Sequence, residues 1–171
     1  EDFGLETRVV RYHNIFGPLG TFDGGREKAP AALCRKIINA KKNNQKIIDV
    51  WGDGEQTRSF LYINDCIEGI LKLFESDYRE PLNIGSDQQV SINQLADIIC
   101  AISNKSDLKR NYLLDKPKGV AGRSSNNDLS KKILKWEFEF TLEHGLQKTY
   151  EWIEKDLISN NMTPNKFSYV A

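Results

Sequence analysis

The side chains best suited to chemistry in this sequence are one lysine, two arginines and one asparagine. Lys28 follows a glycine-rich stretch and precedes Ala-Pro, and Arg58 and Arg123 lie in two separate polar segments. Asn14 falls at the carboxyl end of a short β-branched segment, which is where open α/β sheets place their ligands. Lysine can transfer protons, and free N–H groups at a helix start bind phosphate. The pattern predicts a site for a phosphorylated ligand with a lysine beside it.

The position of Lys28 favours acid–base chemistry, although its protonation state stays open. Pro30 suits the first turn of a helix, so Lys28 is expected at the helix start. The positive end of the helix dipole lies there and favours a neutral amine. A neutral lysine can accept a proton and then return it. The neighbouring Glu27 carboxylate favours the charged ammonium instead.

Both arginines follow glycines that can form tight turns. Arg58 comes shortly after Gly52-Asp53-Gly54, and Arg123 directly follows Gly122. Each guanidinium offers a planar fork that can bind two phosphate oxygens. Two such forks on separate segments can bind a diphosphate from both sides. A solvated surface arginine is the ordinary alternative for each.

The elements that must position these side chains alternate between strands and helices, which predicts an α/β fold. Apolar and β-branched runs predict strands over residues 7–12, 47–50, 57–63, 81–85 and 111–114. The spacing of apolar residues predicts helices over 30–42 and 128–135, and from Asn64, Ser91 and Thr141 onward. Ser91 and Gln94 have the spacing of a capping box, which predicts a sharp helix start.

The first two predicted helices each carry an apolar stripe that should face the core. In the first helix this stripe consists of Leu33, Cys34, Ile37, Ile38 and Ala40. In the second helix Asn64 is expected to be the N-cap, with Asp65 in the first turn. The buried side of that second helix is expected to consist of Ile67, Ile70, Leu71 and Phe74.

Composition and charge argue against several classes of protein. The 171 residues suffice for one domain with a sizeable core. The 24 Lys and Arg residues balance the 24 Asp and Glu residues, which argues against broad binding to nucleic acid or membranes. No apolar run approaches the roughly 20 residues of a membrane span, and no signal peptide is recognised at the start. Cys34, Cys66 and Cys100 lack metal-ligand spacing, which predicts reduced thiols in a cytoplasmic protein.

The sequence is expected to be a later segment of something longer. Residues 1–158 contain all the predicted elements, whereas residues 159–171 show no periodic pattern and are expected to form a loose tail. Residues 3–7 have the pattern of a helix end that runs into a strand, with Gly4 as the stop. The chain is therefore expected to begin inside a domain.

Two patterns have the spacing of dinucleotide-enzyme motifs without their structural setting. Tyr112 and Lys116 match the Tyr-x-x-x-Lys spacing of reductases, but that motif requires a helix. Here the segment is predicted to be a strand that enters a loop. Gly52 and Gly54 lack the third glycine and the following helix of a dinucleotide fingerprint. Neither pattern is assigned a function.

Four segments resemble extended short-chain dehydrogenase/reductases that act on nucleotide sugars. They are Arg11-Tyr-His-Asn-Ile-Phe-Gly-Pro, Gly24-Gly-Arg-Glu-Lys-Ala-Pro-Ala-Ala with Cys34-Arg-Lys, Trp51-Gly-Asp-Gly-x-Gln-Thr-Arg-Ser-Phe and Arg79-Glu-Pro-x-Asn-Ile-Gly-Ser-Asp. Within this group the sequence is similar to GDP-mannose 3,5-epimerases, and Ser59 supports this because most nucleotide-sugar relatives carry Asp there. The resemblance covers residues from about 7 to 158. It implies the carboxy-terminal part of an NAD(P)-binding Rossmann-type fold, with the last Rossmann strand and the small nucleotide-sugar-binding substrate domain.

The resemblance implies an epimerisation with bound NAD. In this family NAD oxidises the sugar at C4, the ketone acidifies the protons at C5 and C3, and an acid–base pair exchanges those protons before the hydride returns. GDP-mannose is thereby converted to GDP-L-galactose and to 3- or 5-epimers. The acid–base lysine of the family corresponds to Lys28. The positions that would hold the GDP-sugar are Asn14, Glu27, Ala29, Lys36, Gln56, Thr57, Arg58 and Arg123.

Several parts of the family's active site have no counterpart in this sequence. The glycine-rich NAD fingerprint, the Tyr-x-x-x-Lys pair and a catalytic cysteine are expected upstream of Glu1. The parent enzyme is expected to be a cytoplasmic homodimer, and this chain alone is expected to be inactive. Two alternatives stay open: a relative with other redox chemistry on nucleotide sugars, such as a 4-epimerase, 4,6-dehydratase or decarboxylase, and a non-catalytic sugar-nucleotide-binding module. The Lys28 segment argues against the first.

Overall fold

The computed structural model of the chain describes residues 3–117 and 119–159. Its strands are β1 (Val10–Tyr12), β2 (Ile15–Phe16), β3 (Ile47–Trp51), β4 (Thr57–Ser59), β5 (Leu61–Tyr62), β6 (Leu82–Ile84), β7 (Gln89–Ser91), β8 (Lys109–Leu113) and β9 (Gly122–Arg123). Its helices are α1 (Ala29–Lys42), α2 (Ile63–Glu75), α3 (Ile92–Ser103), α4 (Asp128–Leu134) and α5 (Leu142–Ser159). No helix in the described part is long and apolar enough to span a bilayer.

The strands pair mostly in parallel, and the predicted α/β fold is confirmed. β1 pairs with β6, β2 with β5 and β3 with β8, all in parallel. β4 lies between β7, which is antiparallel to it, and β9, which is parallel to it. Parallel neighbours need long connections, and helices supply them here: α2 and α3 both lie between β3 and β8 in the chain.

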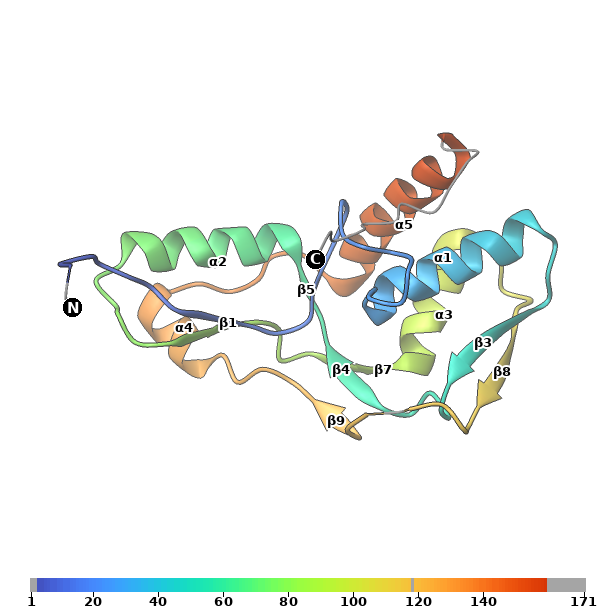
Figure 1. Cartoon of the computed structure of the whole chain (residues 1–171), viewed down its shortest axis with the longest axis horizontal. Coiled ribbons are helices and arrows are strands. Elements are labelled where there is room, and N and C mark those ends of the chain that lie inside the picture. Colours follow the sequence, from blue (N-terminus) through green and yellow to red (C-terminus); the bar gives the residue numbers. More distant parts are fainter. Residues whose placement is uncertain (1–2, 118, 160–171) are drawn as a thin grey trace.

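One half of the molecule, here called the α1 lobe, consists of α1, α3, α5, β3 and β8 (Figure 1). The predicted stripe of α1 is confirmed, since all five of its residues are buried. α1 packs against α5 and α3, and the three helices share one core cluster with the aromatic rings of Phe16, Phe60 and Tyr62. The rings of Phe16 and Tyr62 meet edge-on at 5.9 Å between centroids. This lobe is closed around its own apolar core.

The other half, here called the α2 lobe, consists of α2, α4, β1 and β6 (Figure 1). Its core cluster consists of Leu61, Cys66, Leu73, Leu82, Ile84, Leu134 and Trp136. Within the described residues β1 has a strand neighbour on one edge only, because its single pairing is with β6. Parallel strands normally lie inside a sheet that is covered on both faces. The α2 lobe therefore has the character of an incomplete parallel layer.

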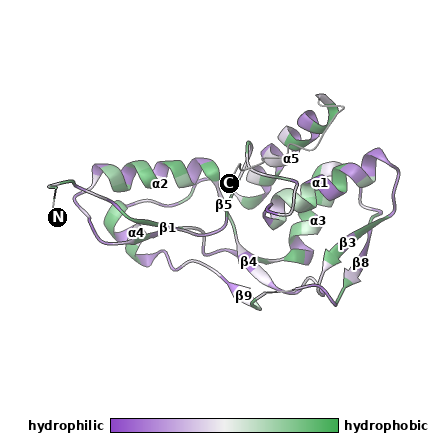
Figure 2. Ribbon diagram, viewed as in Figure 1, coloured by the Kyte–Doolittle hydropathy of each residue, from purple (hydrophilic) through white to green (hydrophobic). Residues whose placement is uncertain are grey.

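The predicted buried face of α2 is wrong in most of its residues. Ile67, Leu71 and Phe74 are exposed by 48%, 54% and 73%, whereas the helix buries Asp65, Cys66, Gly69 and Leu73. The reason is close packing at Gly69, where an added Cβ would lie 3.0 Å from Cδ1 of Ile84 and 3.2 Å from Cε2 of Trp136. Only the glycine face of α2 fits against β6 and Trp136. Figure 2 shows hydrophobic residues along the whole length of α2, so periodicity alone could not select this face.

The predicted start of α2 also differs from the structure. The strand predicted over residues 57–63 is two strands, β4 and β5, because the chain changes sheets at Phe60. β5 then runs directly into α2, so Tyr62 rather than Asn64 is the N-cap. Asp65 lies in the first turn as predicted. Its buried carboxylate accepts hydrogen bonds from the N–H groups of Glu139 and Phe140, which connects α2 to the segment before α5.

Other helix starts follow the sequence more closely. The capping box is confirmed, since Oγ of Ser91 accepts from the Gln94 N–H at 3.0 Å and Oε1 of Gln94 accepts from the Ser91 N–H at 2.8 Å. Oγ1 of Thr141 accepts from the His144 N–H at 3.2 Å at the start of α5. The predicted tail over 159–171 lies outside the described residues apart from Ser159, which ends α5.

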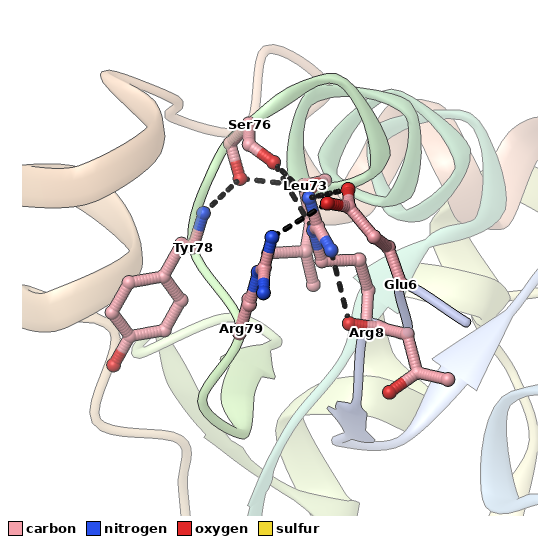
Figure 3. Close-up of polar contacts among 7 residues, drawn as sticks. Glu6, Arg8, Leu73, Ser76, Tyr78 and Arg79 are labelled. Atoms are coloured by element: carbon pink, nitrogen blue, oxygen red, sulfur yellow. Dashed lines mark hydrogen bonds and ion pairs between the residues drawn. The ribbon is translucent and has the colours of Figure 1, made fainter. Parts of the chain in front are cut away.

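A charged cluster joins the segment before β1 to the end of α2 (Figure 3). Arg8 donates from Nε and Nη2 to the carbonyl oxygen of Ser76, at 3.1 Å and 2.6 Å. Ser76 is the C-cap of α2, where a cation complements the negative end of the helix dipole. Glu6 lies between Arg8 and Arg79, with Oε1 2.6 Å from Nη2 of Arg79. These contacts attach the segment that precedes β1 to the end of α2.

Candidate functional site

A cavity of about 480 Å³ lies between the start of α1, the end of β3 and strand β4. Its volume is within the usual range for small-molecule sites. Of the predicted site residues, all but Thr57 and Arg123 line it. The full lining consists of Asn14, Gly25, Glu27, Lys28, Ala29, Ala32, Leu33, Arg35, Lys36, Trp51, Gln56, Arg58, Phe60, Ile92 and Pro117.

Lys28 is the N-cap residue of α1, at the mouth of this cavity. No side chain caps the helix start, and its first turn contains no acidic residue. The first N–H groups and the positive end of the dipole therefore remain available for an anion. In the described part of the chain the Lys28 ammonium makes no hydrogen bond or ion pair. It is exposed and free to meet a ligand.

Asn14 is positioned by the crossing from β1 to β2. Its backbone has φ +46°, in the left-handed region that asparagine tolerates better than most residues. Nδ2 of Asn14 donates to the carbonyl oxygen of Ser59 at 3.0 Å, and its own carbonyl accepts from the Leu61 N–H at 3.2 Å. These bonds place the Asn14 side chain between the end of β1 and the end of β4, on the cavity wall.

Lys36 joins α1 to β3 on another wall of the cavity. Its Nζ donates to the carbonyl oxygen of Asp49 at 2.7 Å. Burial lowers the pKa of the Lys36 ammonium, and the nearby Asp49 carboxylate opposes that shift. Lys36 therefore supplies a half-buried cation to the same cavity as Lys28.

The turn after β3 carries Gln56 and Arg58 into the cavity. Gln56 donates from Nε2 to the carbonyl oxygen of Trp51 at 3.2 Å, while its Oε1 is buried without a hydrogen-bond partner in the described part. Asn93 supports this turn, because its Nδ2 donates to the Asp53 carbonyl oxygen at 3.1 Å. Nη1 of Arg58 donates to the Thr57 carbonyl oxygen at 2.6 Å. The turn is thus held from α3 as well as from β3.

Arg58 and Arg123 are brought together by strand pairing. They are Cα partners in the parallel pair of β4 and β9. Arg123 is exposed and does not line the cavity, whereas Arg58 does. Like charges directly opposite one another in a sheet are destabilising, so this arrangement favours a bound anion. Thr57 does not line the cavity either, since its Oγ1 donates to Oε1 of Gln89 at 2.6 Å.

The sequence missed several cavity residues. Arg35, Trp51, Ile92 and Pro117 line the cavity although no motif singled them out. Arg35 and Trp51 lie inside the segments that carry the family resemblance, which was the available signal. Ile92 and Pro117 come from α3 and the loop after β8, and no local pattern connects these to α1.

The prediction that Tyr112 and Lys116 do not form the helical Tyr-x-x-x-Lys motif of reductases is confirmed. Tyr112 lies in β8, and its hydroxyl donates to Oδ1 of Asn93 at 3.0 Å. Lys116 lies in the loop that follows. The two side chains therefore do not share a helix face.

The cysteines do not form a nucleophilic or metal-binding group. Burial raises the pKa of the Cys34 thiol to about 12 and that of Cys66 to about 11, which disfavours the reactive thiolate. Burial also raises the pKa of Cys100. Among the described residues no three His, Cys, Asp or Glu side chains are grouped as a metal site would require.

Comparison with known sequences identifies relatives of the chain. GDP-mannose 3,5-epimerase 1 of Oryza sativa subsp. japonica is 49% identical over 157 residues, which is 92% of this chain and 40% of that protein. GDP-mannose 3,5-epimerase of Arabidopsis thaliana is 48% identical over the same shares. UDP-glucuronic acid decarboxylase 1 of Xenopus tropicalis is 32% identical over 90% of this chain and 35% of that protein. The chain thus spans about two fifths of the length of the GDP-mannose 3,5-epimerases that it matches.

Two solved structures that resemble this chain are nucleotide-sugar epimerases. UDP-glucose 4-epimerase of Thermotoga maritima, solved with UDP-glucose, has a TM-score of 0.80 at 28% identity over 91% of this chain and 48% of that one. UDP-glucuronic acid 4-epimerase of Bacillus cereus, solved with UDP-glucuronic acid and NAD, has a TM-score of 0.73 at 26% identity over 90% and 47%. Residues 1–85 match the family described as "NAD dependent epimerase/dehydratase family". The chain belongs to this NAD dependent epimerase/dehydratase family.

Proposed function

We propose that the chain is the nucleotide-sugar-binding part of an NAD-dependent GDP-mannose 3,5-epimerase. The observation that carries the proposal is that Arg58 lines the same cavity as the uncapped start of α1 and is paired across β4 and β9 with Arg123. Two guanidinium groups and the positive end of a helix dipole together suit a diphosphate. The identities of 48% and 49% to GDP-mannose 3,5-epimerases favour GDP-mannose as the sugar nucleotide.

In this proposal the chain's own residues bind and orient the sugar and exchange a proton with it. Arg58 and Arg123 hold the diphosphate, and Asn14, Lys36 and Gln56 line the walls around the rest of the ligand. The remaining proposed contacts to the GDP-sugar come from Glu27, Ala29 and Thr57. Lys28 is the acid–base residue that moves a proton at the sugar ring, because its ammonium is exposed at the cavity mouth.

NAD, when bound, supplies the reversible oxidation of the sugar, and the glycine pattern of the described residues does not fit a dinucleotide fingerprint. The glycines at 52 and 54 form a turn between two strands, and no helix follows that turn as a dinucleotide fingerprint requires. We therefore propose that a further part of the protein binds NAD and docks at the open edge of β1 and the apolar face of α2. The unpaired edge and the exposed Ile67, Leu71 and Phe74 support that position.

The remaining properties of the proposed enzyme rest on the resemblance alone. They are a homodimeric parent enzyme, a cytoplasmic location and the lack of activity of this chain by itself. The last of these follows if the cofactor and the second acid–base residue both lie in the further part.

Thermal unfolding of this chain with GDP-mannose or UDP-glucose tests the proposal. At about 100 times its dissociation constant a ligand stabilises the native state by roughly 2.7 kcal/mol. We expect the midpoint to rise with GDP-mannose only, and the rise to shrink in Arg58→Ala. Arg79→Ala is the matched control, because Arg79 pairs with Glu6 in the α2 lobe. A rise with UDP-glucose alone would contradict the choice of GDP-mannose and favour a UDP-sugar enzyme.

A further inference from the structure

Arg35 lines the cavity, and its contacts suggest a role that neither the motifs nor the resemblance assigned. Its Nε donates to the carbonyl oxygen of Phe22 at 2.8 Å, and its Nη2 donates to Oε1 of Glu27 at 3.0 Å. Nε also lies 3.5 Å from Oδ1 of Asp23. The side chains of Arg35 and Glu27 are only 22% and 10% exposed. One guanidinium on α1 thus contacts three residues of the loop that ends at Lys28.

Backbone–backbone hydrogen bonds do not hold residues 22–27 in place. Within the described part of the chain these residues make no backbone–backbone hydrogen bonds. Gly24 and Gly25 have φ values of +90° and +84°, so the loop contains two residues with wide conformational freedom. Their N–H groups instead donate to side chains: Gly24 to Oδ1 of Asp23 at 2.9 Å, and Gly25 to Oε2 of Glu27 at 2.7 Å.

Arg35 is therefore linked to the two glycines of the loop through two carboxylates. Arg35 holds the Glu27 carboxylate, which holds the Gly25 N–H, and Arg35 also lies beside Asp23, which holds the Gly24 N–H. Both oxygens of Glu27 are engaged within the protein. A planar guanidinium is suited to this task because it offers several donors in a fixed geometry, whereas a lysine offers a single point charge.

We propose that Arg35 is the positioning residue of this site: through Glu27 and Asp23 it orders the loop that carries Lys28 before a ligand binds. The inference rests on the proposed function for the identity of the ligand, but not for the order of the loop. A loop that is already ordered loses less conformational entropy when the ligand binds, so the affinity is higher. In this account the Glu27 carboxylate also serves the site by holding the loop that carries Lys28.

The loop has a second attachment at its other end, which makes the effect of Arg35 local. The Phe22 ring packs edge-on against Trp152 of α5, with centroids 5.4 Å apart. Loss of Arg35 should therefore release residues 23–27 while Phe22 stays in place. The core face of α1, which includes Ile37 and Ile38, is buried elsewhere and should keep its structure.

The test combines backbone order with ligand affinity in the whole chain. Order parameters from ¹⁵N relaxation are measured for Gly24 and Gly25 in the wild type, in Arg35→Ala and in Arg35→Lys, and GDP-mannose affinity is measured by calorimetry. Arg35→Lys keeps the charge and the long stem, so it remains informative if Arg35→Ala does not fold. Arg8→Ala is the matched control. Arg8 precedes β1, is similarly buried, and donates to the carbonyl oxygen at the C-cap of α2, far from the loop in the sequence.

We expect order parameters of about 0.85 at both glycines in the wild type and in Arg8→Ala, and below about 0.6 in Arg35→Ala. The affinity for GDP-mannose should fall by about tenfold in Arg35→Ala and by less in Arg35→Lys. Unchanged glycine order in Arg35→Ala, or a loosened loop with unchanged affinity, would overturn the role of Arg35. If the wild type does not bind GDP-mannose, the proposed function fails, while the order parameters still decide whether Arg35 holds the loop.

Discussion

The two lobes of this chain differ in how completely they cover their own apolar residues. In the α1 lobe three helices enclose a core in which Cys34, Ile37, Leu95, Leu146 and Ile153 are fully buried. In the α2 lobe a comparable cluster around Trp136 is buried on one side of α2, while the other side exposes Ile67, Leu71 and Phe74. Both lobes contain parallel strand pairs, yet the predicted ligand cavity lies beside the closed one.

This difference separates two tasks that nucleotide-sugar epimerases combine. The closed lobe can hold the cavity residues of α1, such as Lys28 and Lys36, in place by its own packing, which suits a site that selects a ligand. The open lobe has both an apolar helix face and an unpaired strand edge, which suits a surface that is covered by further protein. In the account given above, the first task is nucleotide-sugar binding and the second is attachment of the cofactor-binding part.

Two leucines on α2 provide the strongest test of the comparison. Leu73 is 1% exposed and Leu71 is 54% exposed, although they are two residues apart on one helix. Leu73→Ala should lower the free energy of unfolding by about 2–5 kcal/mol, because it leaves a cavity in the core. Leu71→Ala should change it by less than about 0.5 kcal/mol, as surface substitutions do. Urea denaturation of both variants measures the difference.

A large loss of stability in Leu71→Ala would break the comparison, because it would mean that this face is covered in the chain itself. Repeating the unfolding at several protein concentrations separates that result from self-association, since only association makes the transition concentration-dependent.

The arginine pair provides a test on the ligand side. Hydrogen bonds to charged groups contribute about 1.5–3 kcal/mol each, so Arg58→Ala and Arg123→Ala should each weaken GDP-mannose binding by roughly 10- to 100-fold. Titration calorimetry at two salt concentrations checks this, and the wild type should show the steeper salt dependence. Equal affinity in Arg123→Ala and the wild type would restrict the diphosphate site to Arg58 and the start of α1.

The capping box of α3 gives a smaller effect within the closed lobe. Ser91→Ala removes the acceptor for the Gln94 N–H and should lower the free energy of unfolding by about 1 kcal/mol. Ser106→Ala is the control, because Ser106 is exposed and outside the helix. If the two variants are equally stable, the closed lobe does not depend on this helix start.

The smallest expected effect is a pH dependence on the surface of the closed lobe. Hydrogen bonds from Lys46 and Lys105 hold the pKa of the Asp107 carboxyl at about 2, below its ordinary value. Because the folded-state pKa is lowered, the stabilisation is present above about pH 4 and is lost as the pH falls through about 2. Between these pH values the wild type should lose slightly more thermal stability than Asp107→Asn. The difference should vanish in about 1 M salt, which screens exposed charges.

Local patterns in the sequence predicted local structure well. The stripe of α1 and the capping box of α3 are both confirmed, because they depend on spacing within a few residues. The buried face of α2 could not be predicted in this way. The apolar stripe of α2 is wider than the face that is buried, and the close approach of Gly69 to Ile84 and Trp136 decides which edge of the stripe faces the core.

In the candidate site, too, local features could be predicted from the sequence and contacts between distant segments could not. The helix start at Lys28 was visible from the glycines and Pro30. The juxtaposition of Arg58 with Arg123 depends on strand pairing across more than sixty residues, and spacing alone could only suggest it. The contacts of Arg35 were not visible at all, because they require the loop to fold back over the second turn of α1.

Titration of this chain with GDP-mannose and, separately, with NAD tests the central claim most directly. The account predicts that GDP-mannose binds with measurable heat to the cavity beside the closed lobe, and that NAD produces no saturable heat. Saturable NAD binding would contradict the assignment of the cofactor site to a further part of the protein. An absence of GDP-mannose binding in a cooperatively folded chain would contradict the proposal that this chain holds the nucleotide-sugar site by itself.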